Sequence, residues 1–428
     1  MNKTYYEQIE ETVYRDVLPN GLQVVLVPKT EMAQTYGVFT TNYGSIDQTF
    51  VPINQQDLIT VPDGIAHFLE HKLFEKEDRD VFQDFTKIGA SANAFTSFTK
   101  TAYLFSATSD IIENTKILLD FVQTPYFSDQ SVEKEKGIIA QEIQMYDDQP
   151  DWRAFFGIIG AMYEKHPVRI DIAGTVDSIN QITKEDLYTC YETFYHPSNM
   201  VLVLVGNFDP MELLEVITTN QASKTFEQMP PIERHYLTEP AHVYEKNVSI
   251  EMPVAVPKCM VGIKEVPQTD KESFIKEDLL ADMLLDHFYS RSGIYYQELY
   301  DLDLIDGNLG FETERQKQFT FSLVGGNTEN PDLFAQKVKE QLSSFKDYQL
   351  VNEDFERMKR KMIGQLLRSM NRVSDIANQV SHYQMLDLDF FNLLPTLESL
   401  TLEEANDFLN NWIKDDNVAV FQVKPTQE

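Results

Sequence analysis

The stretch TKEDLYTCYETFYHPSNMVLVLVG, residues 183–206, contains a complete helix–strand unit. Thr183 is suited to cap a helix, because its hydroxyl can accept a hydrogen bond from a backbone N–H of the first turn, and Asp186 nearly completes a capping box. About three turns of helix follow, and the chain then passes Asn199 into the apolar run MVLVLVG. This order predicts a helix that leads directly into a buried strand.

A second stretch aligns with the first without a gap. Residues 401–424, TLEEANDFLNNWIKDDNVAVFQVK, repeat the cap, the helix, the asparagine and the strand, and here Thr401 and Glu404 form a full capping-box pattern. The offset is about half of the 428 residues, which predicts two copies of one domain, spanning residues 1–225 and 226–428. The alternative is a coincidence between two common helix–strand units, since the identity of the two stretches is low.

The starts of the two halves also correspond. Residues 20–44 contain an Asn-Gly turn and two strand-like runs, and residues 248–265 contain two similar runs. Helices are expected over 272–289 and 352–380, and a strand over 316–326. Because strands and helices do not alternate regularly, the sequence predicts the α+β class.

Composition limits the classes of partner and compartment. The net charge of −32 argues against nucleic acid, whose phosphates would be repelled, and permits neutral or basic substrates. The alternative is that the acidic residues serve general solubility. Cys190 and Cys259 match no metal-binding spacing and indicate free thiols in a reducing cytosol. The N-terminal residues lack a signal-peptide pattern and no apolar run is long enough to span a bilayer, so we expect a cytoplasmic protein without membrane contact.

The segment GIAHFLEHKLFEKE, residues 64–77, places His67, Glu70 and His71 among large apolar residues. Asp63 is a candidate N-cap, and in the helix that follows the two histidines lie one turn apart on one face. Two such imidazoles can bind Zn²⁺, and an adjacent carboxylate can take a proton from zinc-bound water. The alternative is a pair of core histidines, but three polar groups would then need partners in an apolar setting.

A zinc ion needs a third protein ligand, and residues 131–152 offer one. The pattern predicts a helix that ends before Pro150. Glu142 lies between isoleucines on this helix, and a buried carboxylate is costly unless it is paired or binds a metal. Glu135 lies two turns earlier on the same face and is a candidate supporting or proton-handling carboxylate. The alternative for Glu135 is a solvated charge within a charged run.

HFLEH, followed by EKEKGIIAQEIQMYDD, resembles the pitrilysin family of zinc peptidases, which includes insulinase and the mitochondrial processing peptidase. The likeness is closest to the short bacterial members and covers nearly the whole chain. It implies that His67, His71 and Glu142 bind zinc, that Glu70 is the general base and that Glu135 is a supporting acid. It also implies two similar domains, each a mixed, mostly antiparallel sheet backed by helices, which together form half of a peptidase chamber.

The segment GASANAFTSFTKTAYLFSA, residues 89–107, resembles the family's active-site edge strand, to which a peptide substrate adds as a further strand. Asn93, Ala94 and Phe95 would line this strand. Small residues here allow another backbone to approach, and TAYLFSA follows as a partner strand. The alternative for Ala90–Ala94 is a tight bend between a helix and a hairpin.

One departure from the family concerns the second half. Family members carry an Arg and then a Tyr that grip the substrate, whereas the matching segment 295–312 has Tyr300 and Asp306 at these positions. We therefore predict a zinc-dependent endopeptidase for peptides or unfolded segments, with a related M16-type partner chain that supplies the missing residues. A homodimer would lack these residues altogether. The alternative is a non-catalytic scaffold subunit that retains a zinc site.

Overall fold

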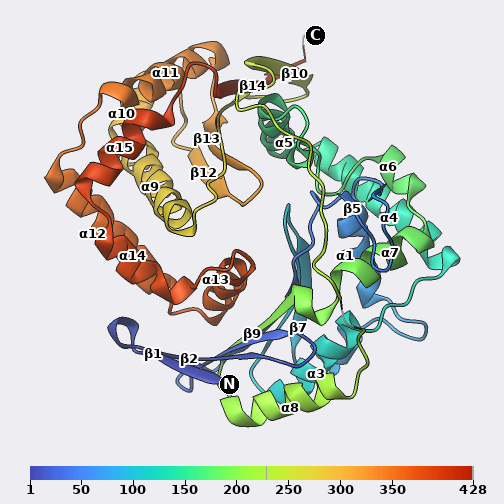
Figure 1. Cartoon of the computed structure of the whole chain (residues 1–428). Coiled ribbons are helices and arrows are strands. Elements are labelled where there is room, and N and C mark those ends of the chain that lie inside the picture. The colour runs from blue at the N-terminus through green and yellow to red at the C-terminus, as the bar shows by residue number, and fades with distance from the viewer. Residues whose placement is uncertain (228, 427–428) are drawn as a thin grey trace. The chain divides into compact units, whose positions relative to one another are not determined.

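The computed structural model describes residues 1–227 and 229–426. The chain, drawn whole in Figure 1, folds into two compact units. Unit 1 contains Met1–Ile143, Asp171–Tyr236 and Leu367–Phe391. Unit 2 contains Gln144–Ile170, Leu237–Leu366 and the residues from Asn392 onward.

Unit 1 is built on a mixed, mostly antiparallel sheet. Its strand order is β1-β2-β3-β9-β4-β8-β7, and only β3 and β9 pair in parallel. The bounds are β1 Asn2–Tyr6, β2 Glu11–Val17, β3 Gln23–Pro28, β9 Met200–Gly206, β4 Thr35–Thr41, β8 Thr101–Ala107 and β7 Ser91–Thr96. Every residue of β9 is buried, because this apolar strand lies in the middle of the sheet. A separate two-stranded ribbon pairs β5, Thr49–Phe50, with β6, Ile59–Thr60.

Unit 2 repeats this arrangement with fewer strands. Its order is β10-β14-β11-β13-β12, and β10 and β14 form the parallel pair. The bounds are β10 Asn247–Met252, β14 Val418–Pro425, β11 Lys258–Glu265, β13 Thr320–Asn327 and β12 Leu309–Arg315. Each sheet therefore contains one parallel pair, followed by antiparallel strands that end at a comparable edge, β7 or β12. The prediction of two similar α+β domains is confirmed.

Helices cover both sheets. Those of unit 1 are α1 Ile65–Phe74, α2 Phe82–Lys87, α3 Ile111–Val122, α4 Asp129–Asp147, α6 Val176–Gln181, α7 Lys184–Phe194, α8 Pro210–Ala222 and α13 Val373–Met385. Those of unit 2 are α5 Pro150–Met162, α9 Lys271–Tyr289, α10 Ile294–Asp301, α11 Pro331–Ser343, α12 Asn352–Ser369, α14 Leu393–Ser399 and α15 Leu402–Trp412. The last residues of α4 and of α12 extend beyond the unit in which most of the helix lies.

The internal repeat is visible in its hydrogen bonds. Thr183 and Thr401 both form complete capping boxes at the starts of α7 and α15. Asn199 donates to the backbone carbonyl of Phe194, and Asn417 donates to that of Trp412, five residues earlier in both cases. The same polar side chains thus end equivalent helices before equivalent strands, β9 and β14. These equivalent contacts favour a repeat over a chance likeness between two helix–strand units.

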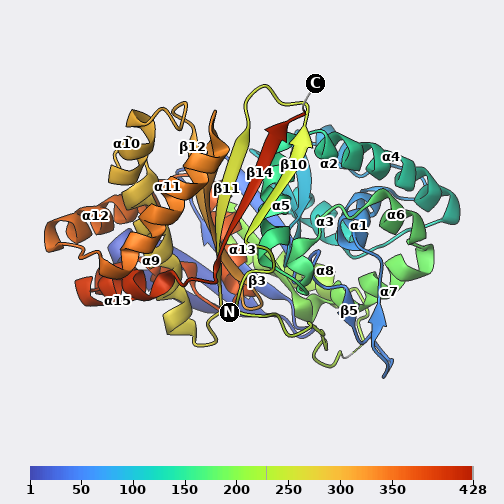
Figure 2. The same cartoon turned by 90° about the horizontal axis from the view of Figure 1, so that it is seen from above.

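The compact units do not coincide with the halves of the sequence, because each half contributes one helix to the unit that the other half mainly forms. Helix α5 of the first half packs on β11 and β14, beside which Figure 2 shows it. Helix α13 of the second half packs on β4 and β9, where Ser381 lies 2.7 Å from Thr40, hydroxyl to hydroxyl. The helix predicted over 352–380 is accordingly broken between Ser369 and Val373. The predicted domain boundary between residues 225 and 226 concerns the repeat in the sequence, and it stays a prediction.

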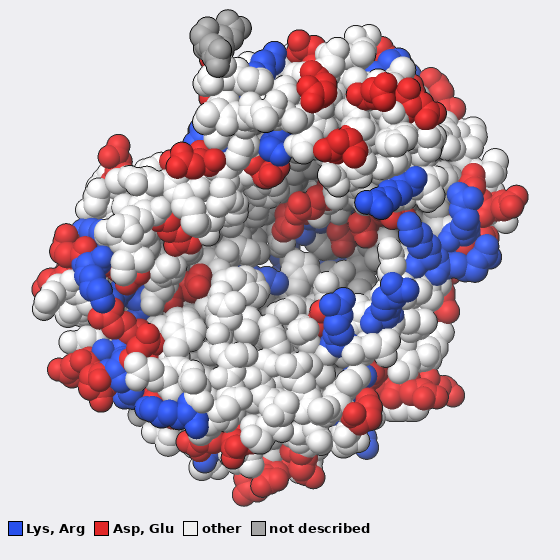
Figure 3. Space-filling view, turned by 180° about the vertical axis from the view of Figure 1, so that it is seen from behind, with Lys and Arg blue, Asp and Glu red and all other residues white. Residues whose placement is uncertain are grey.

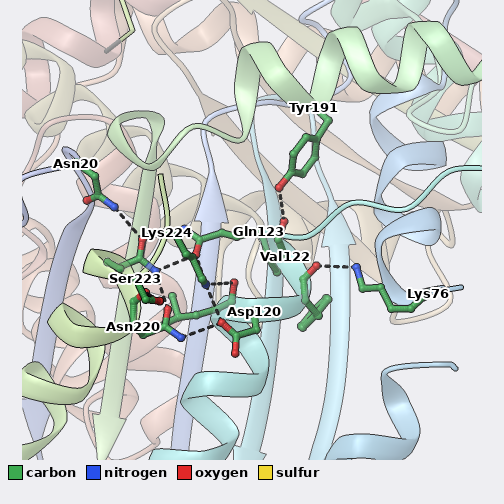
Figure 4. A network of polar contacts seen from close by, with 12 residues as sticks. Asn20, Lys76, Asp120, Val122, Gln123, Tyr191, Asn220, Ser223 and Lys224 are labelled. Carbon is green, nitrogen blue, oxygen red and sulfur yellow. Dashed lines mark hydrogen bonds and ion pairs between the residues drawn. The ribbon is translucent and has the colours of Figure 1, made fainter. Parts of the chain in front are cut away.

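A polar network holds the C-terminal ends of α3 and α8 together (Figure 4). Lys224 Nζ lies 2.8 Å from the Asp120 carboxylate and donates to Gln123 Oε1 at 2.7 Å. Lys76, which follows α1, donates to the backbone carbonyl of Phe121 at 2.8 Å. The end of α1 is therefore anchored to the C-terminus of α3, where a cation is favourable for the helix dipole.

Charged side chains of both signs are dispersed over the surface that Figure 3 shows. In the whole sequence, Asp and Glu number 68 against 36 Lys and Arg. Among the described residues, no helix is both long enough and apolar enough to cross a bilayer.

Candidate metal centre

Helix α1 carries the histidines and begins at a tight backbone approach. Its N-cap is Gly64, with φ of 85°, and no side chain caps the helix. A Cβ atom at Gly64 would lie 2.4 Å from the carbonyl oxygen of Ala173, so only glycine fits there. The prediction that Asp63 is the N-cap is therefore wrong. Its backbone carbonyl instead accepts a hydrogen bond of 2.9 Å from the Ser178 hydroxyl.

His67 and His71 lie on one face of α1, as their spacing predicts. Their ring centroids are 4.6 Å apart. Burial is the main cause that lowers the pKa of His67 to about 4, so this imidazole is neutral at pH 7 and its nitrogen is available as a ligand. Burial also lowers the pKa of His71, but the hydrogen bond to Glu135 and the charges of nearby glutamates outweigh it and leave the pKa raised.

Glu142 of α4 faces both imidazoles. Its carboxylate oxygens lie 3.7 Å from His67 Nε2 and 3.6 Å from His71 Nε2, and its side chain is 21% exposed. Tetrahedral ligands at about 2.0–2.2 Å from a zinc ion lie roughly 3.3–3.6 Å from one another, so these separations suit that ion. Within residues 1–227 and 229–426, this is the one group of His, Cys, Asp and Glu side chains with such geometry. Two imidazole nitrogens and one carboxylate are a donor set that fits zinc and leaves a fourth position open. His71, whose pKa is raised, would give up a proton on binding the ion.

Glu135, one helical turn before Ile139 on α4, is not a solvated charge. Its side chain is 11% exposed, and its Oε1 lies 3.1 Å from His71 Nδ1. Burial raises the pKa of Glu135, but the hydrogen bond with His71 and the charges of His71 and Lys72 outweigh burial and hold that pKa below its usual value. An anionic Glu135 is suited to fix the ring orientation of His71.

Glu70 lies beside the histidines and is held by a residue that sequence reasoning missed. The Thr96 hydroxyl donates a hydrogen bond of 2.8 Å to Glu70 Oε2. Burial raises the pKa of Glu70 despite this bond, which suits a carboxylate that accepts a proton. The signal in the sequence was weak. Thr96 directly follows Asn93, Ala94 and Phe95, which are predicted to line the substrate strand, but nothing in the sequence shows which way its hydroxyl points.

Strand β7 is the last strand of the unit 1 sheet and pairs with β8. Asn93 is exposed, whereas Ala94 and Phe95 are half-buried. The alternative of a tight bend over Ala90–Ala94 is wrong, because Ser91–Thr96 form β7 and pair with β8. The turn lies earlier, at Gly89, with φ of 74°. That these three residues bind substrate stays a prediction.

The two residues that stand where the family carries Arg and Tyr lie in unit 2. Tyr300 is on α10, is 51% exposed and stacks on Tyr296 with ring centroids 6.4 Å apart. Asp306 follows α10 and accepts a hydrogen bond of 3.0 Å from the backbone N–H of Asn308. Tyr300 has a phenol at the end of its side chain and Asp306 a carboxylate, so neither reproduces the charge of an arginine.

Comparisons with known proteins identify the family of this chain. Residues 61–176 match the family model "Insulinase (Peptidase family M16)", and residues 181–362 match "Peptidase M16 inactive domain". An uncharacterised zinc protease of Bacillus subtilis, YmfH, is 48% identical over 421 residues, which are 98% of each chain. The crystal structure of a putative M16-like peptidase from Alicyclobacillus acidocaldarius has a TM-score of 0.93 and 41% identity, and the match covers 97% of this chain and 99% of that one.

A more distant likeness is to a chain about twice as long. The fold matches the periplasmic protease PqqL of Escherichia coli with a TM-score of 0.74 and 17% identity, covering all of this chain and 48% of that one. At this identity the likeness shows the fold alone. The family models and the Bacillus relative together show that the chain belongs to peptidase family M16, the insulinase family.

Proposed function

We propose that the protein is a zinc-dependent endopeptidase that cleaves peptides or unfolded protein segments inside a chamber. The observation that carries this proposal is the convergence of His67, His71 and Glu142, from two different helices, beside a partly buried Glu70. Three ligands with an adjacent carboxylate are typical of catalytic zinc, whereas structural zinc sites have four protein ligands.

The chain's own residues have distinct tasks in this reaction. Bound zinc would polarise the scissile carbonyl and lower the pKa of the attacking water. Glu70 accepts a proton from that water and passes it to the leaving amine. Thr96 holds the carboxylate of Glu70 in position through its hydrogen bond. The free edge of β7, with Asn93, Ala94 and Phe95, would align the substrate by main-chain hydrogen bonds.

The partner and compartment form a second part of the proposal. Tyr300 and Asp306 lack the charge of an arginine, so we propose that a related M16-type chain supplies the gripping residues, which a homodimer of this chain would lack. The match of this fold to about half of PqqL supports a chamber made from two such chains. Cys190 and Cys259 are buried and free, which supports a reducing compartment, the cytoplasm. The excess of acidic residues favours basic substrate segments.

The direct test replaces Glu70 by Gln. We expect Glu70→Gln to retain zinc and to lose peptide cleavage by at least about 100-fold, because an amide cannot accept the proton. His71→Ala should instead lose the metal. Cleavage that survives in a properly folded Glu70→Gln enzyme would contradict the assignment. The assay uses the chain alone and with a co-purified relative.

A second candidate function is a scaffold subunit that holds zinc without catalysis. Tyr300 and Asp306 in place of Arg and Tyr favour it, since the gripping half of the site is absent from these positions. A zinc-loaded protein that cleaves no peptide, alone or with its relative, would support the scaffold. The placement of Glu70 beside the ligands argues for catalysis, because a structural site has no use for a proton acceptor.

A further inference from the structure

We propose that Lys72 is a positioning residue of the zinc site, which acts on the metal ligand His71 through Glu135. This inference rests on the proposed function, because it assigns a role to a residue that touches neither the metal position nor the substrate strand. Lys72 directly follows His71 in α1, and its side chain reaches toward α4.

The burial of Lys72 is the first observation. Its side chain is 0% exposed, although lysine is almost never fully buried unless it is paired. Its ammonium contacts the carboxylate of Glu75 and lies 3.5 Å from the backbone carbonyl of Ser131. Ser131 belongs to the first turn of α4, so the ammonium lies where the two ligand-bearing helices meet.

The second observation connects this position to the histidine. Ser131 and Glu135 are four residues apart and therefore lie on the same face of α4. The Lys72 ammonium, beside the Ser131 carbonyl, therefore lies about one helical turn from Glu135, near enough for its charge to favour the carboxylate form. That carboxylate in turn lies 3.1 Å from His71 Nδ1. Glu135 thus lies between the buried charge of Lys72 and the imidazole whose Nε2 faces Glu142.

The third observation is an asymmetry between the two histidines. His67 Nδ1 is buried and has no hydrogen-bond partner in the described part of the chain, whereas His71 Nδ1 has Glu135. A carboxylate behind a ligating histidine fixes its tautomer and raises its basicity. His71 is therefore the ligand whose orientation depends on a second residue, and Lys72 is the buried cation next to that residue.

A purely structural role for Lys72 would be an ion pair with Glu75 at the end of α1. The two are three residues apart, and such pairs form readily on an exposed helix face. Glu75, however, is 35% exposed, and its contact does not require a lysine ammonium that is shielded from water and turned toward α4. Removing each charge separately distinguishes the two roles.

The test compares Lys72→Met, which keeps the length of the side chain without its charge, with Glu75→Gln, which removes only the pair at the end of α1. Zinc dissociation constants are measured by competition with a chelator, and thermal unfolding of the zinc-free proteins is measured in parallel. We expect Lys72→Met to weaken zinc binding by about 10- to 100-fold, as for other residues behind a ligand, and Glu75→Gln to change it by less than about threefold.

A double variant tests whether Lys72 acts on His71 through Glu135. If Lys72 acts through Glu135, Lys72→Met should weaken zinc binding no further once Glu135→Gln is present. Independent, additive losses would overturn the proposal, and so would wild-type affinity in Lys72→Met. Lys72→Gln, which keeps a donor for Ser131 but no charge, replaces Lys72→Met should the latter be unstable without zinc, and the same outcomes apply.

Peptide cleavage tests the proposed peptidase function separately from the zinc affinities, which test the role of Lys72. A wild-type protein that binds zinc but cleaves no peptide would contradict the proposed catalysis, while the comparison of zinc affinities would still support or overturn the role of Lys72. A wild-type protein without affinity for zinc would contradict both.

Discussion

The Thr96 hydroxyl donates a hydrogen bond of 2.8 Å to the Glu70 carboxylate, and so joins the edge strand β7 to the zinc-site helix α1. A proton acceptor works best when its orientation is fixed before the substrate arrives. This contact couples the strand proposed to align the substrate to the carboxylate proposed to activate water.

Thr96→Val keeps the shape of the side chain and removes its hydroxyl. We expect kcat to fall about 10- to 100-fold with little change in KM, because the lost bond is made to a charged group and not to the substrate. Thr96→Ser should restore most of kcat. Steady-state kinetics on one peptide would test this. An equal rise in KM with unchanged kcat would instead assign Thr96 to substrate binding.

Acid should destabilise the protein through His382, a half-buried histidine away from the metal site. On α13, burial is the main cause that lowers the pKa of His382 to about 3, with a further contribution from Lys100, whose Nζ lies 3.3 Å from its Nδ1. The unfolded state then binds more protons than the folded state between pH 6.5 and about 3, so stability is complete above the unfolded pKa and falls as pH is lowered. The free energy of unfolding should decrease by about 1.4 kcal/mol per pH unit for this one histidine.

Urea unfolding of the zinc-free protein between pH 7 and pH 5 measures this slope. His382→Gln should reduce the slope by the equivalent of one proton, whatever it does to the stability at pH 7. An unchanged slope would show that His382 is not kept neutral by burial.

The packing of α5 on the unit 2 sheet can be tested by replacing two glycines of this helix, one of which serves as a control. A Cβ atom at Gly157 would lie 2.2 Å from the ring of buried Phe421, whereas one at Gly160 would meet nothing within 4 Å. Gly157→Ala should lower the free energy of unfolding by about 1–3 kcal/mol through overpacking. Gly160→Ala should raise it by about 0.5–1 kcal/mol through helix propensity. Thermal or urea unfolding of both variants measures the difference, and similar effects at the two positions would contradict this packing.

The sequence alone predicts features that depend on local patterns. Thr183 and Thr401 mark two helix starts, and the order of strands and helices predicts the α+β class of both units. The histidine pair and Glu142 were predicted because helical spacing fixes which side chains share a face.

Other features depend on contacts between distant segments, which no local pattern specifies. An amphipathic pattern shows that α5 and α13 each bury a face, but not that each packs on the sheet of the other half. The cap at Gly64 depends on the approach of Ala173, and the partner of Glu135 depends on how α4 lies against α1. Thr96 was missed for the same reason.

Zinc stoichiometry in purified variants tests the central claim most directly. Elemental analysis of the wild type and of Glu70→Gln should give one zinc ion per chain, because Glu70 is not a ligand. His71→Ala and Glu142→Ala, folded by circular dichroism, should both lose the ion, since each removes one of the three converging ligands. Zinc retained at full stoichiometry in Glu142→Ala, or absent from the wild type, would contradict a metal centre formed between α1 and α4.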